Sequence, residues 1–413
     1  MHPALAERAR DTAKLILTRL ADPVVVEEAV AASERRATLP YGWGGPGLFV
    51  GHAGSALAFQ AAHRAFPHEA AHWRGLAHQH LATAAKASFD SPLTHAGVSS
   101  GTAGLAFAFA DSLREEPRYG GTLDKLNAQL ADQVLDAPSW RGRDGVRDRD
   151  YDAISGAAGT LAHLSAVRDP DPLVRRAIGS LLDDLSWLCQ GNWVIHPRDY
   201  PLPEYADNYP HGYVNLGLAH GIPGPMAALS FAHRAGHRRD GVVEAIRHTA
   251  DYLAEQSCRW PVGIPLSESG TEVRDRAKPG RLAWCYGAPG VACALLNASI
   301  TLDDNDIRHV AVEGFSAALD GFDGLPEATL CHGVAGVLVI STIFASHNRR
   351  GPSDVEMLTE HLLSHCDKDF PLGVRENGLD DPGLLTGSAG VALALLTATG
   401  DIDRHWQRAL LFT

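Results

Sequence analysis

The chain contains 413 residues, of which 45% are hydrophobic and 21% charged, and it carries a formal net charge of −13 at pH 7. This length and apolar content allow a large buried core, and the acidic balance argues against nucleic acid as a partner. No apolar run approaches the roughly 20 residues that a membrane span needs, and residues 1–20 form a charged amphipathic segment unlike a signal peptide. Because the six cysteines are scattered along the chain, we expect a cytoplasmic protein with reduced thiols.

Two kinds of helical segment alternate along the chain. Amphipathic stretches predict helices at roughly 3–20, 68–88, 122–135, 172–189, 240–258, 305–320 and 354–366. Asp171 and Pro172 provide an N-cap and a first-turn proline for the fourth stretch, and Ser353 with Glu356 resembles a capping box for the seventh. Between these stretches lie Gly-x-x-Gly motifs, each followed by a run rich in Ala, Leu and Val. The motifs start at Gly51, Gly101, Gly156, Gly221, Gly287, Gly333 and Gly387.

This alternation predicts the fold. A helix that is apolar on all sides must be buried on all sides, and the motif starts lie 46 to 66 residues apart, a spacing that suits helical-pair repeats. We therefore expect an all-α protein, an α/α toroid of seven inner and seven outer helices, forming one domain over residues 1–413. The intervals 190–219 and 259–282 are too long for helix pairs alone, and we expect them to wall the functional cavity.

Two of the motif starts carry residues typical of a metal site. Cys285 lies two residues before Gly287, and Cys331 and His332 directly precede Gly333. Two thiolates and one imidazole make a three-ligand zinc site with an open fourth position, which is typical of catalytic zinc. We predict one Zn²⁺ per chain, bound by Cys285, Cys331 and His332. The other cysteines are expected to be structural; they are Cys189, Cys258, Cys293 and Cys366.

Several motifs in register resemble the lanthionine synthetase C-like (LanC-like) family. They are YDAISGAAG around Asp152, GLAHGIPGP around His220, WCYGAPG around Cys285 and CHGVAG around Cys331, and with the glycine repeats they cover about residues 40 to 395. The resemblance implies a zinc-dependent lanthipeptide cyclase, in which cysteine thiols of a precursor peptide add to dehydroalanine or dehydrobutyrine and form (methyl)lanthionine thioether rings. No kinase-like, lyase or dehydratase segment precedes the motifs, so we expect a stand-alone cyclase.

The resemblance also implies catalytic roles for His220, Asp152, Arg281 and Tyr286. Because an imidazole with a pKa near 6.5 suits proton transfer at neutral pH and a carboxylate can fix its tautomer, His220 is predicted to move the proton with help from Asp152. Arg281 keeps its proton and is predicted to stabilise the enolate that addition produces. Which of His220 and Arg281 delivers the final proton stays open. The metal is expected to favour ionisation of the substrate thiol, whose pKa in water is about 8.5.

The implied partners are a dehydrated lanthipeptide precursor with its leader peptide, a dehydratase and an exporter. Association with a membrane-bound biosynthetic complex is therefore an alternative to a purely cytoplasmic location. The charged stretch 114–150 is a candidate for leader binding. Three other functions stay open: addition of glutathione to dehydrated peptides, a non-catalytic peptide-binding scaffold on the same fold, and a zinc prenyltransferase β-subunit. The low aromatic content, 7%, argues against the last, because an isoprenoid site needs an aromatic funnel.

Overall fold

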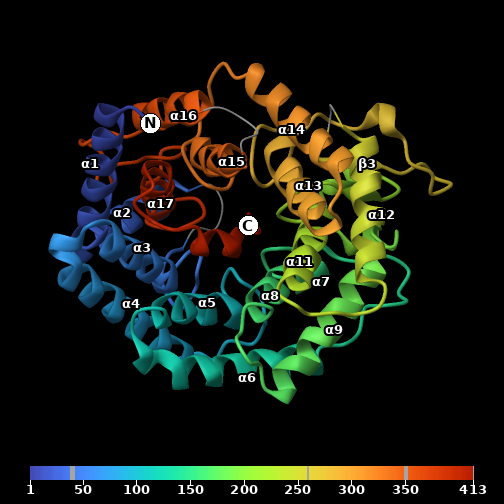
Figure 1. The fold of residues 1–413 in the computed structure, drawn as a ribbon, viewed down its shortest axis with the longest axis horizontal. Helices are drawn as coiled ribbons and strands as arrows, with labels where there is room; N and C mark the ends of the chain where they lie inside the picture. Colours follow the sequence, from blue (N-terminus) through green and yellow to red (C-terminus); the bar gives the residue numbers. More distant parts are fainter. Residues whose placement is uncertain (38–41, 258–259, 348–351, 413) are drawn as a thin grey trace. The chain divides into compact units, whose positions relative to one another are not determined.

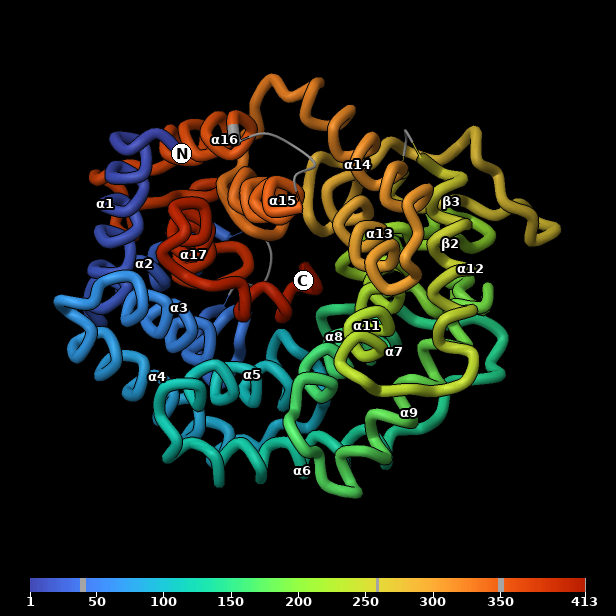
Figure 2. Tube along the Cα trace, in the orientation of Figure 1, coloured from blue at the N-terminus to red at the C-terminus, as the bar shows by residue number. Residues whose placement is uncertain are grey.

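The computed structural model describes residues 1–37, 42–257, 260–347 and 352–412. Figures 1 and 2 show its helices as a ribbon and as a tube. These helices belong to two compact units. Unit 1 comprises Met1–Leu93, Ser99–Leu123 and Phe322–Trp406, and unit 2 comprises Thr94–Val98, Asp124–Gly321 and Gln407–Thr413. Within the described ranges, every helix is too short or too polar to cross a lipid bilayer. The single-domain organisation stays a prediction.

Unit 1 pairs buried helices with amphipathic ones. The buried helices are α3 (His52–Ala65), α5 (Thr102–Leu113), α15 (Val334–Ser346) and α17 (Ser388–Thr399). The amphipathic helices α1 (Pro3–Leu20), α4 (Ala70–Asp90) and α16 (Pro352–Ser364) pack against α17, α3 and α15 respectively (Figure 1). A further helix, α2 (Pro23–Arg36), follows α1 and was not predicted.

Unit 2 repeats the same pairing. Its buried helices are α8 (Ala157–Leu164), α11 (Pro223–Arg234) and α13 (Ala288–Leu302), and α11 packs against both of the others. The amphipathic partners are α9 (Pro172–Leu188), α12 (Val242–Glu255) and α14 (Asn305–Asp320). The remaining amphipathic helix is α6 (Gly120–Asp136), so all fourteen predicted helices are present in the described part of the chain. The short helices are α7 (Asp148–Tyr151), α10 (Tyr205–Asn208) and the 3₁₀ turns Pro67–Glu69, Pro117–Tyr119, Pro197–Asp199, Arg274–Arg276 and His405–Leu410.

One of the two predicted caps is confirmed. Asp171 is the N-cap of α9 and its carboxylate accepts a hydrogen bond from the Val174 N–H at 2.8 Å. The capping box at Ser353 was wrong, because α16 already begins at Pro352 and Ser353 lies inside its first turn. Glu356 instead accepts a hydrogen bond from the His2 backbone N–H at 2.6 Å, which ties the start of the chain to α16.

The glycine motif before α13 is explained by a close approach of the backbone at the start of that helix. Gly287 has a φ of +110°, and a Cβ there would lie 1.8 Å from the Arg281 carbonyl oxygen. A Cβ on Gly290 would lie 2.1 Å from the Trp284 carbonyl oxygen. Since Cβ atoms cannot approach a carbonyl so closely, the loop that folds back over the first helical turn requires glycine at both positions.

Main-chain hydrogen bonds connect the loops that precede successive buried helices. In unit 2 the Ala153 N–H donates to the Ala219 carbonyl at 3.0 Å, and the Ala219 N–H donates to the Cys285 carbonyl at 3.3 Å. In unit 1 the Cys331 N–H donates to the Leu385 carbonyl at 3.1 Å. The three loops of unit 2 that precede α8, α11 and α13 are therefore fixed to one another by their backbones.

The two long intervals form a small sheet that was not predicted. Strands β1 (Val194–Ile195), β2 (Tyr213–Asn215) and β3 (Gly263–Pro265) pair antiparallel in the order β1-β2-β3, with Val194 opposite Val214 and Val214 opposite Ile264. Strand β2 ends five residues before His220. The sheet therefore joins both intervals and holds the segment that leads into α11.

Candidate active site

His220 and Asp152 form a hydrogen-bonded pair in unit 2. The His220 Nδ1 lies 2.6 Å from the Asp152 Oδ2. Asp152 is only 2% exposed, and its Oδ1 accepts backbone hydrogen bonds from Ile154, Ser155 and Gly156 at 3.1, 2.6 and 2.8 Å. These N–H groups belong to the turn before α8, so the start of that helix fixes the carboxylate. The pair leaves Nε2 as the imidazole nitrogen that can exchange a proton with a substrate.

The surroundings of His220 raise its affinity for a proton. Burial alone would lower the pKa of His220, but the hydrogen bond and negative charge of Asp152 outweigh it, with further contributions from Asp148 and Cys285, so that the pKa is raised above its ordinary value. The side chain remains 37% exposed. A histidine with one nitrogen held by a carboxylate and the other accessible can accept and return a proton near neutral pH.

Tyr286 lies beside this pair. Its ring centroid is 6.3 Å from that of His220, and its hydroxyl accepts a hydrogen bond from the Asn215 side-chain amide at 3.4 Å. Burial raises the pKa of the Tyr286 hydroxyl, so it stays protonated. The ring fits against Gly217, where a Cβ would lie 2.4 Å from the Tyr286 Cδ1 and 2.5 Å from the Cys285 carbonyl oxygen. Neither Asn215 nor Gly217 was recognised from the sequence.

A second carboxyl group, Asp148, lies one helical turn before Asp152. Asp148 is 9% exposed, and its Oδ1 is buried without a hydrogen-bond partner among the described residues. Burial first and the nearby Asp152 charge second raise the pKa of Asp148, His220, Asn215 and Tyr151 lower it, and the net result is a pKa of about 7. The sequence offered one signal that was not used, the four-residue spacing of two aspartates in Asp-Arg-Asp-Tyr-Asp.

Asp148, Asp152 and His220 line the same cavity, which has a volume of about 540 Å³. One wall comes from the interval 190–219 and includes Tyr200, Leu202 and Tyr205. The interval 259–282, which was predicted to wall the same cavity, lines a different one. Leu202 is an exposed apolar side chain. The cavity is large enough for several side chains of a peptide. Its lining combines aromatic and aliphatic side chains with the titratable groups of Asp148, Asp152 and His220.

Arg281 lies apart from this cavity. Arg281 is exposed and is one of the residues that line a different cavity of about 620 Å³, together with Trp260, Leu282 and Ala317. Its backbone approaches Gly287, as described above. The role predicted for the Arg281 guanidinium in stabilising an enolate stays a prediction.

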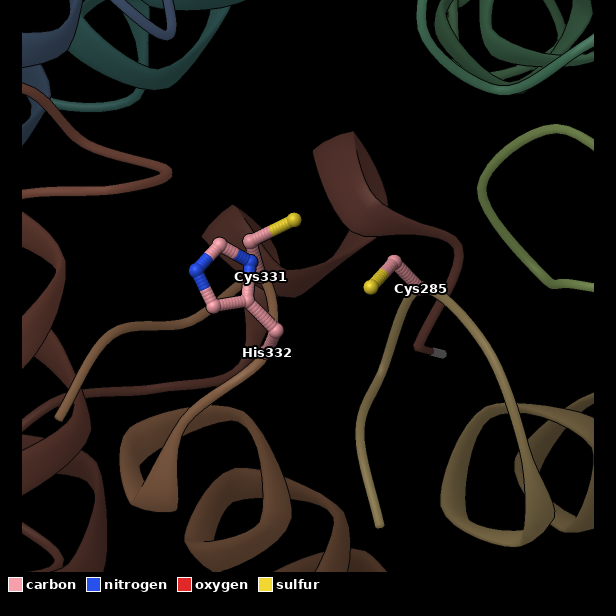
Figure 3. Close-up of side chains that lie close together, drawn as sticks. All are labelled: Cys285, Cys331 and His332. Carbon is pink, nitrogen blue, oxygen red and sulfur yellow. The ribbon is translucent and has the colours of Figure 1, made fainter. Parts of the chain in front are cut away.

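Cys285, Cys331 and His332 supply ligand atoms that lie within 4.8 Å of one another (Figure 3). Cys285 is buried, and Cys331 and His332 are half-buried. Figure 3 shows the three side chains on the loops that precede α13 and α15. Two thiols and one imidazole at this separation are a donor set that fits Zn²⁺ with one coordination position left for another ligand.

Two carboxylates flank His332 in unit 1. The His332 Nε2 lies 3.8 Å from the Glu327 Oε2, and Glu376 also offers an oxygen within 4.8 Å of these atoms. Glu376 accepts a hydrogen bond from the Ala328 N–H at 2.8 Å, and burial raises its pKa. Carboxylates commonly orient a metal-binding histidine through its second nitrogen. The sequence gave no spacing rule that would have found Glu327 or Glu376.

The surroundings of the other cysteines agree with the structural role predicted for them. Cys189 and Cys293 are fully buried, and the Cys293 thiol donates to the Phe412 carbonyl at 3.2 Å. Cys366 is half-buried at the end of α16, and Cys258 lies outside the described residues. Trp284 is a buried packing residue whose indole N–H donates to the Leu410 carbonyl at 2.9 Å.

Comparison with known proteins identifies what the chain is similar to. The family model described as "Lanthionine synthetase C-like protein" matches residues 42–411. Nisin biosynthesis protein NisC of Lactococcus lactis subsp. lactis is 26% identical over 324 residues, which are 76% of each chain. A solved structure, described as nisin cyclase, matches with a TM-score of 0.77 at 22% identity and covers 94% of this chain and 96% of its own. This structural likeness confirms the predicted all-α, α/α-toroid fold.

Proposed function

Because the chain belongs to the lanthionine synthetase C-like family, we propose that it is a lanthipeptide cyclase that closes thioether rings in a dehydrated precursor peptide. The observation that carries the proposal is the His220–Asp152 pair, which opens into a peptide-sized cavity and lies next to the Cys285 loop. The name of the similar Lactococcus protein places it in nisin biosynthesis, which supports a peptide substrate of the same class here.

The reaction needs a proton to leave a thiol and to arrive at a carbon atom. We propose that His220 accepts the proton through Nε2 while Asp152 stabilises the resulting imidazolium through Nδ1. The thiol sulfur then bonds to the β-carbon of the dehydroamino acid, and the double-bond electrons move toward the carbonyl oxygen to give an enolate. His220 returns the proton to the α-carbon. The peptide gains a ring and its mass does not change.

We also propose that the protein binds one metal ion. Cys285, Cys331 and His332 would hold one Zn²⁺, which would supply a positive charge that favours ionisation of the reacting thiol. Glu327 and Glu376 would orient His332. Tyr286 would form part of the wall next to His220.

The test uses purified protein and a synthetic peptide with one dehydroalanine and one cysteine. We expect loss of the alkylatable thiol without a change of mass, faster than in the protein-free reaction. A peptide with serine in place of cysteine should stay linear, and His220→Ala should slow ring closure by roughly 10²-fold, the usual scale for loss of a general acid or base. In a parallel reaction that also contains glutathione, a product that gains the mass of glutathione would favour the glutathione-adding activity. Ring closure at the uncatalysed rate would leave a peptide-binding scaffold.

A further inference from the structure

The cavity that holds His220 also contains a carboxyl group for which the mechanism above has no role. Asp148 is more than nine-tenths buried and lines this cavity, and its Oδ1 has no hydrogen-bond partner within the described residues. A buried polar oxygen without a partner is costly, so natural structures rarely keep one unless a ligand or reaction uses it. The position of Asp148 therefore indicates contact with something that enters the cavity.

The neighbours of Asp148 favour its neutral form. Asp152 lies one turn later on the same backbone, and its N–H donates to the Asp148 carbonyl at 2.9 Å. Asp152 accepts hydrogen bonds from three backbone N–H groups and pairs with His220. When two carboxyl groups share a site, the one with fewer donors keeps its proton more readily. The rise of the Asp148 pKa to about 7 agrees with this arrangement.

Besides Asp152 and His220, the titratable groups near Asp148 are tyrosines, arginines and Asp199. Tyr151, Tyr205, Tyr213 and Tyr286 all have raised pKa values, with burial as the first cause, so they stay uncharged near neutral pH. The charged groups in the same cavity wall are Arg147, Arg149, Arg198 and Asp199. Arg147 lies 3.0 Å from Asp199, and Arg198 lies 2.9 Å from Asp144. These two arginines are thus paired with other carboxylates.

We propose that Asp148 acts as a neutral carboxylic acid that donates a hydrogen bond to the substrate carbonyl oxygen as that oxygen takes on enolate charge. The inference rests on the proposed cyclase function and gives Asp148 the role predicted above for Arg281, which lines another cavity. The thiol proton still passes through His220 to the α-carbon, and Asp148 keeps its own proton throughout. A buried acid that donates to a developing oxyanion is a known catalytic device.

Three variants test the proposal in the ring-closure assay. Asp148→Ala removes the donor and should slow ring closure by about 10²-fold, the scale of losing one oxyanion donor. Asp148→Asn keeps an N–H donor that cannot ionise, so its rate should stay within about tenfold of wild type. Asp251→Asn, an exposed carboxylate on α12, is the control and should match wild type. Circular dichroism and melting curves verify that each variant is folded.

The pH dependence of the ring-closure rate shows whether Asp148 acts as a neutral hydrogen-bond donor or as a negative charge beside His220. If Asp148 must be protonated, the wild-type rate falls as pH rises through about 7, and the ratio of the Asp148→Asn rate to the wild-type rate increases from pH 6 to pH 8.5. If Asp148 acted instead as an anion that raises the pKa of His220, the asparagine variant would lose protonated His220 sooner and the ratio would decrease. A decreasing or constant ratio overturns the proposal, as does an alanine variant with wild-type activity.

Failure of the proposed cyclase function and failure of the Asp148 inference give different results. Absence of wild-type cyclase activity would remove the proposed function. Wild-type ring closure that is indifferent to Asp148 would remove only this inference. If Asp148→Ala does not fold, the rate ratio of the asparagine variant alone decides.

Discussion

At the scale of single residues, the chemistry of the proposed site depends on how one carboxylate is held. Asp152 uses one oxygen for three backbone N–H groups and the other for His220. The first set fixes its position, and the second raises the pKa of the imidazole. A substitution that keeps the backbone hydrogen bonds of residue 152 but removes its negative charge should therefore show how much of its effect on His220 is electrostatic.

Asp152→Asn is that substitution. Since its side-chain oxygen can still accept the backbone hydrogen bonds, we expect a folded protein in which the pKa of His220 is lower and ring closure is slower by roughly 10²-fold. The measurement is the rate as a function of pH for wild type and variant. An unchanged profile would mean that Asp152 does not control the protonation of His220.

We also expect wild type and Asp152→Asn to differ in stability by an amount that depends on pH. The pKa of His220 is higher in the folded protein than its unfolded value of about 6.5. The stabilisation is therefore complete below about pH 6.5 and is lost as pH rises through the higher folded value. Melting temperatures between pH 5.5 and 9 should show wild type above Asp152→Asn at the acidic end, with the gap closing toward the alkaline end. A gap that widens with pH would contradict the raised pKa.

At the scale of elements, the sequence predicted the helices better than the connections between them. The buried and amphipathic helices were found because each has a run of 8 to 21 residues with a clear pattern. Helix α2 was missed although Asp22 caps it, since Val24, Val25 and Val26 lower helix propensity. The sheet was missed because strands of two or three residues are too short for alternation to be recognised.

The residues of the candidate site were also predicted from the sequence only in part. The cluster of Cys285, Cys331 and His332 and the pairing of His220 with Asp152 followed from motifs. The cavity that Arg281 lines, the missing hydrogen-bond partner of the Asp148 Oδ1 in the described part of the chain and the position of Glu376 beside His332 depend on packing between segments distant in the sequence. No local pattern encodes such contacts.

Gly217→Ala tests how tightly the loop before α11 is packed. A methyl group there would meet the Tyr286 ring and the Cys285 carbonyl at 2.4 and 2.5 Å. We expect a loss of about 1–3 kcal/mol in unfolding free energy, as for an overpacked core, together with slower ring closure. Gly75→Ala is the matched control, because Gly75 lies within α4 with open space around it, and should stabilise the protein by up to about 1 kcal/mol. Equal stability of the two variants in denaturant titrations would contradict the packing described here.

At the scale of the whole molecule, the proposed metal ligands occupy the loops before α13 and α15, whereas the stability of the protein comes from its buried helices. Those helices are lined by aliphatic side chains such as Val291, Leu295, Val337 and Ile340. We therefore expect the core to be stable without a bound ion. The proposed metal should be removable without unfolding.

Cys331→Ala tests this separation of metal binding from folding. We expect the purified variant to lose the one zinc ion per chain, measured by elemental analysis, while its far-ultraviolet circular dichroism stays that of wild type. Cys366→Ala, which removes a half-buried thiol outside the proposed ligand set, should keep the ion. Wild-type protein that closes rings with no metal would refute the zinc proposal, and unfolding on chelation would show that the metal is structural.

The main-chain hydrogen bonds from Ala153 to Ala219 and from Ala219 to Cys285 have a practical consequence for protein engineering. They set the positions of Asp152, His220 and Cys285 through groups that every amino acid shares, whereas the cavity wall formed by Tyr200, Leu202 and Tyr205 contributes only side chains. Randomising Leu202, the exposed residue of this wall, should therefore yield libraries that retain the wild-type fold and differ in which peptides they accept.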